Sequence, residues 1–175
     1  MANINDILGD IEGDDAFYDP HSGEMIPEGT YPAHIVSLGL KSNIQLKNGS
    51  KADIYTPKYR LDKTAGKYAD EEVLDGGIFR FKGENKGRGR GGGNERYKEF
   101  LDFTGIALED VEVNGRKVIR LPSISEHDVF GVPVFITVYH DSFEGRNGKV
   151  TTERANIAHA WGDGERLDPN DEVPF

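Results

Sequence analysis

A cationic, glycine-rich segment is the part of the sequence whose side chains could do chemistry. Residues 80–98 contain seven lysines and arginines, two glutamates and six glycines. Such a segment cannot pack a core, so we expect a mobile loop that carries positive charge. A single-stranded nucleic acid needs cations near its phosphates and exposed aromatic faces on which its bases stack. The segment therefore predicts phosphate binding, and a solvated loop without a binding role is the alternative.

Side chains on the strands around this segment could complete the site. Lys58 and Arg60 lie on one expected strand and Arg80 and Lys82 on the next, and we expect these four cations on like faces. Core packing is the alternative to base stacking for the aromatic residues, and stacking is favoured for Tyr55 and Tyr59. The full set of candidate nucleic-acid-binding residues is Tyr55, Lys58, Tyr59, Arg60, Phe79, Arg80, Phe81, Lys82, Lys86, Arg88, Arg90, Arg96, Tyr139 and Trp161.

The elements that must position these residues are mostly strands. Apolar, β-branched or alternating patterns predict strands at 31–40, 52–61, 77–82, 117–121, 132–140 and 150–161. In the last of these strands, we expect Ala155, Ile157, His159 and Trp161 on one side. The intervening residues 41–50 and 62–75 are typical of a turn and a loop.

A single helix is expected between the third and fourth main strands. Asn94 is a candidate N-cap, and Tyr97, Phe100, Leu101 and Thr104 have the spacing of a buried stripe. No alternation of strand and helix appears, which argues against a parallel Rossmann-type sheet. The order predicts a mainly β fold, an OB-fold-like antiparallel Greek-key barrel with one α-helix between strands 3 and 4.

The charge is divided unevenly among three segments. The whole chain of 175 residues has a formal net charge of −10, which alone argues against a nucleic-acid partner. Residues 1–28 hold eight acids and no lysine or arginine, whereas residues 162–175 hold five acids and one arginine. The body, residues 29–161, holds 18 acids and 20 bases. We therefore expect an acidic N-terminal segment with a short helix at 4–12 and a linker at 13–28, a binding domain, and an acidic disordered tail. The two acidic ends could cover the basic groove until DNA displaces them.

Other chemistries find little support in the sequence. The chain has no cysteine, and its histidines show no metal-ligand spacing. Gly87, Gly89 and Gly92 match GxGxxG, but the loop is long and no βαβ unit surrounds it. We expect no catalytic residue, metal or cofactor, although a metal-dependent nuclease built from separated carboxylates would leave no local motif. The chain lacks a signal peptide and a membrane-length apolar run, so we expect a cytoplasmic protein without a membrane partner.

The C-terminal tip combines acidic residues with a final aromatic one. Such a tip could fill an apolar pocket ringed by lysine or arginine on a partner, with an ordinary solvated tail as the alternative. The candidate partner-binding residues are Asp171, Glu172, Val173, Pro174 and Phe175. The tip resembles that of bacterial and phage single-stranded-DNA-binding proteins, which is acidic and ends in Ile-Pro-Phe or a similar triplet.

Residues 27–161 resemble small phage DNA-binding proteins encoded among replication and recombination genes. The resemblance rests on PEGTYPAHI at 27–35, the helix ending in Thr104-Gly105, GVPVFITV at 131–138 and RANIAHAW at 154–161. It implies a protein that coats single-stranded DNA in the cytoplasm of an infected host. For the C-terminal tip, we expect that displacement by DNA frees it to recruit a polymerase, helicase, primase, nuclease or recombinase. A protein-interaction module and a small nuclease or nuclease accessory protein remain as alternatives, and monomer and dimer both remain open.

Overall fold

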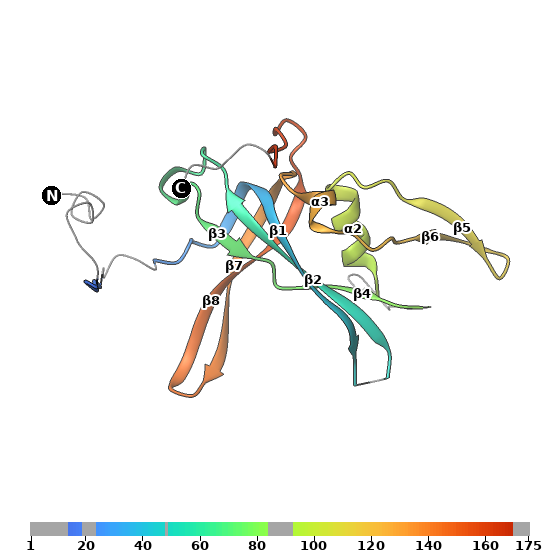
Figure 1. Ribbon diagram of the computed structural model, residues 1–175, viewed down its shortest axis with the longest axis horizontal. Helices are drawn as coiled ribbons and strands as arrows, with labels where there is room; N and C mark the ends of the chain where they lie inside the picture. Colours follow the sequence, from blue (N-terminus) through green and yellow to red (C-terminus); the bar gives the residue numbers. More distant parts are fainter. Residues whose placement is uncertain (1–13, 19–23, 48, 84–92, 170–175) are drawn as a thin grey trace.

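The computed structural model describes residues 14–18, 24–47, 49–83 and 93–169, and its main feature is an antiparallel sheet (Figure 1). The strands follow the order β3–β2–β1–β7–β8, and β4 pairs with β2 beyond the end of β3. Their bounds are Gly29–Gln45 for β1, Lys51–Leu61 for β2, Glu72–Leu74 for β3, Ile78–Phe81 for β4, Pro133–Gly145 for β7 and Gly148–Ala160 for β8. The prediction of a mainly β, antiparallel protein is confirmed.

The sheet does not close through a continuous ladder. Its two edges, β3 and β8, approach each other where a single parallel bridge joins Asp75 to Ala155. The two long hairpins, β1–β2 and β7–β8, extend beyond this region and splay apart (Figure 1). The sheet is therefore open, and within the described residues its two edge strands meet only at this bridge.

Three short helical elements and a second, two-stranded sheet complete the described fold. They are the 3-10 helix η1 at Gly66–Tyr68, α2 at Glu95–Phe103, α3 at Glu126–Val129, and a hairpin of β5 at Glu109–Val113 with β6 at Arg116–Arg120. The predicted stripe of α2 is confirmed, because Tyr97, Phe100, Leu101 and Thr104 are all buried. The loop expected at 62–75 contains η1 and β3, whose few residues are too short to show a periodic pattern.

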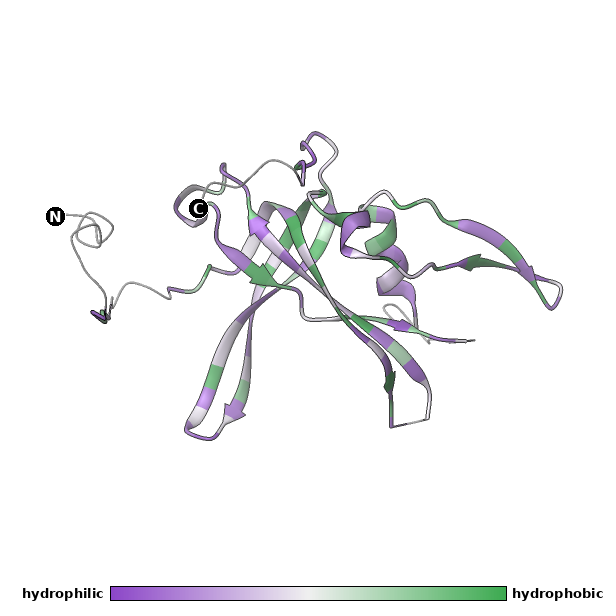
Figure 2. Ribbon diagram, in the orientation of Figure 1, coloured by the Kyte–Doolittle hydropathy of each residue, from purple (hydrophilic) through white to green (hydrophobic). Residues whose placement is uncertain are grey.

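The core lies between one face of the sheet and α2. The strands contribute Ile35, Tyr55, Tyr59, Val134, Ile136 and Val138, each at most 1% exposed. Ile26 is also 1% exposed, and its backbone N–H donates to Glu153 at 2.7 Å while its carbonyl oxygen is 2.8 Å from His140 Nε2. The expectation that residues 13–28 form only a linker is therefore wrong for its last part. In Figure 2, hydrophobic and hydrophilic positions alternate along the strands, as a sheet with one buried face requires.

The last strand contains a β-bulge, so the four side chains expected on one side of it do not share one face. Ile136 pairs with Ile157, but Phe135 pairs with His159, so Ala158 is the extra residue. Ala155 and Ile157 contribute to the core, whereas His159 and Trp161 lie beside Phe135, with ring centroids 4.7 and 5.5 Å from its ring. One inserted residue thus divides the four side chains that strict alternation places together.

The described part of the C-terminal segment docks against the body. Arg166 Nε donates to the carbonyl of Phe130 at 3.0 Å, and Leu167 N–H donates to the carbonyl of Gly131 at 2.9 Å. Gly131 has φ +78°, and a Cβ there would lie 2.3 Å from the Leu167 carbonyl oxygen, so this contact requires glycine. The boundary expected at residue 162 is therefore wrong, because the chain is anchored at least to Leu167.

Candidate nucleic-acid interface

The register of β2 with β4 separates the predicted cations onto two faces. Asp53 pairs with Arg80 and Tyr55 with Ile78, which places Arg80 on the core-facing side. Ile54 pairs with Phe79 on the opposite side, which we call the open face. Residues two apart on a strand share a face, so Thr56, Lys58 and Arg60 also belong to the open face. The expectation that Lys58 and Arg60 share a face with Arg80 and Lys82 is therefore wrong.

Tyr55 and Tyr59 belong to the core and present no ring to a base. Both are 0% exposed, and the Tyr55 ring stacks on Tyr97 with centroids 5.4 Å apart. The Tyr55 hydroxyl accepts a hydrogen bond from Ile124 N–H at 3.2 Å, and the Tyr59 hydroxyl donates to Asp75 at 2.6 Å. Along β2, Tyr55 and Tyr59 alternate with Ile54 and Lys58, and the tyrosine side is the buried one. The expectation that these two tyrosines stack on bases is therefore wrong.

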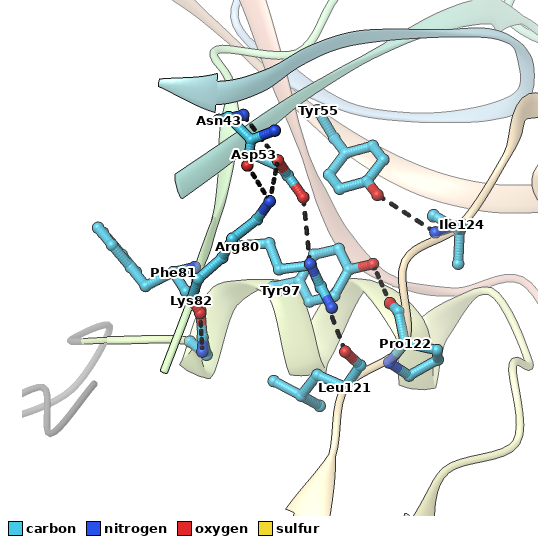
Figure 3. A network of polar contacts seen from close by, with 11 residues as sticks. Asn43, Asp53, Tyr55, Arg80, Phe81, Lys82, Tyr97, Leu121, Pro122 and Ile124 are labelled. Atoms are coloured by element: carbon cyan, nitrogen blue, oxygen red, sulfur yellow. Dashed lines mark hydrogen bonds and ion pairs between the residues drawn. The ribbon is translucent and has the colours of Figure 1, made fainter. Parts of the chain in front are cut away.

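Asp53, which is buried, forms ion pairs with two of the predicted phosphate-binding cations, the partly buried Arg80 and the exposed Lys82 (Figure 3). Asp53 is 5% exposed, and its carboxylate lies 3.1 Å from Arg80 Nη1 and 3.4 Å from Lys82 Nζ. Arg80 Nε also donates to the Leu121 carbonyl at 3.2 Å, and Lys82 donates to the Asn43 side chain. Burial would raise the pKa of Asp53, but the hydrogen bond from Asn43 N–H and the charges of Lys82 and Arg80 outweigh it and lower that pKa. Arg80 and Lys82 thus stabilise a buried carboxylate.

Asp75 engages a third predicted cation where the two sheet edges meet. Its side chain is 0% exposed, and it accepts hydrogen bonds from the Tyr59 hydroxyl and from Gly77 N–H at 2.9 Å. Arg96 reaches it from α2 at 3.4 Å and donates to the Gly77 carbonyl at 3.1 Å. Burial raises the pKa of Asp75 against the opposing effect of these hydrogen bonds and of Arg96. Arg96 therefore joins α2 to the sheet.

Two further aromatic candidates, Tyr139 on β7 and Trp161 just after β8, make packing contacts. The Tyr139 hydroxyl lies over Gly76, where a Cβ would come within 2.3 Å of it. The Trp161 ring lies 5.6 Å from that of His34 and 5.5 Å from that of Phe135. Both side chains are half-buried, and among the described residues their rings make no aromatic contact with Phe79 or Phe81.

The open face carries an aromatic pair that the core does not use. The rings of Phe79 and Phe81 stack with centroids 5.6 Å apart and planes inclined by 14°, and Phe79 is 38% exposed. Ile54 and Thr56 lie beside them on β2, and Gly39 leaves the neighbouring position on β1 without a side chain. We call Phe79, Phe81, Ile54 and Thr56 the aromatic platform. Stacking of a base on such a surface needs no particular sequence, because every base has a π-face.

Two lysines flank the aromatic platform. Lys41 pairs with Ile54 from β1, and Lys58 lies four residues further along β2. Among the described residues, no carboxylate forms an ion pair with either lysine. Arg60, by contrast, pairs with Glu72 at 3.1 Å. Lys41 was missed because the strand expected at 31–40 continues to Gln45 through an irregularity between Lys41 and Ile44.

Asn94 fixes the cationic segment to the platform. Its side chain accepts a hydrogen bond from Phe81 N–H at 2.7 Å and donates to the Phe81 carbonyl at 3.0 Å. It precedes α2 as expected, but makes no capping hydrogen bond within the helix because its amide is bound to β4. Asn94 and Phe81 are thus held together on either side of residues 84–92. Lys86, Arg88 and Arg90 belong to these residues, which lie outside the described part of the chain.

Comparison with known proteins does not identify a family for this chain. The chain matches no protein-family model, and no curated protein is significantly similar to it. Within the described ranges, no three histidine, aspartate or glutamate side chains are grouped so that they could hold a metal ion. The same part of the chain contains no helix with the length and apolar character of a membrane span.

The Asp53 network predicts a specific dependence of stability on pH. Because the folded-state pKa of Asp53 is lowered, its ionised form stabilises the fold above the ordinary aspartate pKa of about 3.9, and this stabilisation disappears as pH falls through the folded-state pKa. Asp53→Asn should lower the free energy of unfolding by ~1–3 kcal/mol at neutral pH. Urea denaturation across the pH range measures this difference, which should shrink as pH falls below about 4.

Asp102→Asn is the matched control, because Asp102 forms an exposed pair with Lys98 at 2.8 Å on α2. That substitution should cost only ~0.3–0.5 kcal/mol. Equal destabilisation of the two variants would contradict a structural role for the Asp53 network.

Proposed function

We propose that this protein binds single-stranded DNA on the open face of its sheet, with little sequence preference. The observation that carries the proposal is the exposed Phe79–Phe81 stack beside Lys41 and Lys58, from which the cationic segment begins. The aromatic rings would stack bases, and the lysines would contact phosphates. Lys86, Arg88 and Arg90 would add contacts from the segment that Asn94 holds at the platform.

An OB-like barrel is the architecture that supports this function best. The order β3–β2–β1–β7–β8, the parallel bridge at Asp75 and the position of α2 between β4 and β7 all agree with a five-stranded, partly open Greek-key barrel. In such a barrel, the outer face of the second and third strands binds oligonucleotides. That face corresponds to β2 and β4, which carry the aromatic platform.

A binding assay distinguishes this proposal from the two other classes of function. Labelled oligo-dT is mixed with the full chain, with and without magnesium, and resolved by gel shift. Binding without cleavage supports the proposal. Absence of binding favours a protein-interaction module, and magnesium-dependent cleavage favours a nuclease.

Removal of the exposed aromatic ring should weaken DNA binding. Phe79→Ala should reduce affinity for oligo-dT roughly 5- to 150-fold, because stacking on one aromatic contributes ~1–3 kcal/mol per base. Phe79→Trp should retain affinity, since it keeps a ring at the same place. Phe17→Ala is the control, because Phe17 is 57% exposed but lies in the N-terminal segment. Fluorescence anisotropy measures all four chains, and an unchanged affinity for Phe79→Ala would exclude the platform.

Removal of the flanking lysines should change the salt dependence. Replacing Lys41 and Lys58 with alanine should flatten the slope of log K against log salt by about 0.7 for each lysine that touches a phosphate. Arg88→Ala with Arg90→Ala should have a similar effect. Lys67→Ala removes one lysine charge from η1, where Lys67 pairs with Glu24 at 2.6 Å, and should leave the slope unchanged. Equal slopes in every variant would place the phosphates elsewhere.

The acidic C-terminal tip would compete with DNA and recruit partners. Asp171, Glu172, Val173, Pro174 and Phe175 lie outside the described residues, but the chain that leads to them is anchored by Arg166 and Leu167. A tip that resembles those of single-stranded-DNA-binding proteins would engage a polymerase, helicase, primase, nuclease or recombinase. In a phage-encoded protein, both roles would be performed in the cytoplasm of the host.

Truncation after Pro169 tests both roles without removing the anchor. The shortened chain should bind oligo-dT more tightly at low salt, with the gain disappearing at high salt, because the competition is electrostatic. It should also fail to capture purified replication and recombination proteins. Phe175→Ala is the matched control, since it should abolish capture but keep the competition. A truncated chain that behaves like the full one would contradict both roles.

A further inference from the structure

The β5–β6 hairpin is separated from the main sheet and projects from the body (Figure 1). Asn114 and Gly115, with φ +53° and +76°, form its turn. Every residue of its two strands is exposed except Val111, which is intermediate. Val113, Val118 and Ile119 are 40–44% exposed, although Val and Ile are usually buried. The hairpin therefore presents apolar side chains and unpaired strand edges that the described parts of the chain leave uncovered.

The charges of the hairpin are sorted by strand. β5 carries Glu109, Asp110 and Glu112 and no cation, whereas β6 carries Arg116, Lys117 and Arg120 and no carboxylate. Across the hairpin, Glu109 pairs in register with Arg120, and Glu112 with Lys117. Among the described residues, none of these six side chains forms an ion pair. One free edge of the ribbon is therefore acidic and the other is basic.

Physical chemistry favours a third strand at such an edge. A two-stranded ribbon is marginally stable in water, and its unpaired N–H and C=O groups can template another strand. Like charges opposite each other on neighbouring strands are destabilising, and opposite charges are stabilising. Pairing of β5 with a second β5, or of β6 with a second β6, would oppose like charges. Pairing of β5 with β6 opposes unlike ones, as the hairpin itself already does.

We propose that the β5–β6 hairpin joins successive copies of this chain head to tail, with the acidic β5 edge of one copy against the basic β6 edge of the next. Such a contact is heterologous, because the two surfaces differ, so it forms open rows rather than closed dimers. A row of copies along one strand of DNA would make binding cooperative. That consequence rests on the proposed function, whereas the pairing of edges does not.

The contact should be weak in free protein and effective on DNA. Five-residue strands form a small interface, and the net charge of −10 makes copies repel each other in solution. Neighbours on one DNA strand are held at high effective concentration, which strengthens a weak contact without changing it. The affinity of each protein copy should therefore be higher for long poly-dT than for an oligo-dT that holds only one copy.

Charge reversal with a rescue by mixing tests the contact. The first variant carries Glu109→Lys and Glu112→Lys, so both of its strands are basic. The second carries Lys117→Glu and Arg120→Glu, so both of its strands are acidic. A third chain carries all four substitutions and keeps opposite charges within its hairpin. Self-association without DNA is measured by sedimentation velocity over a concentration series, and cooperativity by comparing poly-dT with the short oligo-dT.

Each two-site variant alone should associate about tenfold more weakly than the wild type or not at all, because its two edges repel. An equimolar mixture of the two variants should restore association, since basic edges then meet acidic ones. The four-site chain should associate like the wild type.

Restoration by mixing cannot result from an unfolded hairpin. A wild type that stays monomeric throughout, variants that associate normally, or a mixture that fails to restore association would each overturn the proposal. If the hairpin instead pairs with a strand of a different protein, mixing the two variants would not restore their association.

The test separates this proposal from the proposed function. Failure of every chain to bind the short oligo-dT would refute DNA binding, while sedimentation without DNA would still report on the hairpin. Normal binding of oligo-dT without association or cooperativity would refute the hairpin contact alone.

Discussion

Two buried carboxylates, Asp53 and Asp75, set the constraint on which the rest of the structure depends. A carboxylate taken out of water must be paired and hydrogen-bonded, because its desolvation is otherwise too costly. Asp53 meets this requirement with Arg80 and Lys82, and Asp75 meets it with Tyr59 and Arg96. The first network fixes β4 to the end of β2, and the second joins α2 to the place where the sheet edges meet. Arg80, Lys82 and Arg96 therefore hold the fold together, and the proposed DNA binding is assigned to the lysines of the open face.

The amino-acid sequence was sufficient to predict the main elements and the antiparallel class. Strong periodic patterns located five of the six strands of the main sheet and the buried stripe of α2, because burial of one face imposes that period. Short elements such as β3 could not be predicted, since three residues have no period. The bulge at Ala158 also escaped, because one extra residue changes the facing of a strand without changing its composition.

The candidate residues on β2 and β4 were expected on a single face, and the structure divides them between two. Alternation along β2 shows that Tyr55 and Tyr59 oppose Ile54 and Lys58, but not which side is buried. That choice is made by tertiary contacts, the stacking of Tyr55 on Tyr97 and the hydrogen bond of Tyr59 to Asp75. Net charge has the same limit, since a local excess of arginine and lysine does not show which cations have internal partners.

These contacts divide the described charges into three groups according to their distance from the core. Cations beside the core pair with Asp53 and Asp75, and those on the open face flank Phe79. The charges on the β5–β6 hairpin have no ion-pair partner among the described residues. In the first group the carboxylates are buried, with side chains 7% and 0% exposed, so these pairs are screened less than the charges of the other two groups. Exposed charges are screened over a Debye length of about 10 Å at 0.1 M salt. The proposed DNA binding and the proposed association of copies should therefore both weaken with salt, and more strongly than the fold does, because the charges that they use are more exposed than Asp53 and Asp75.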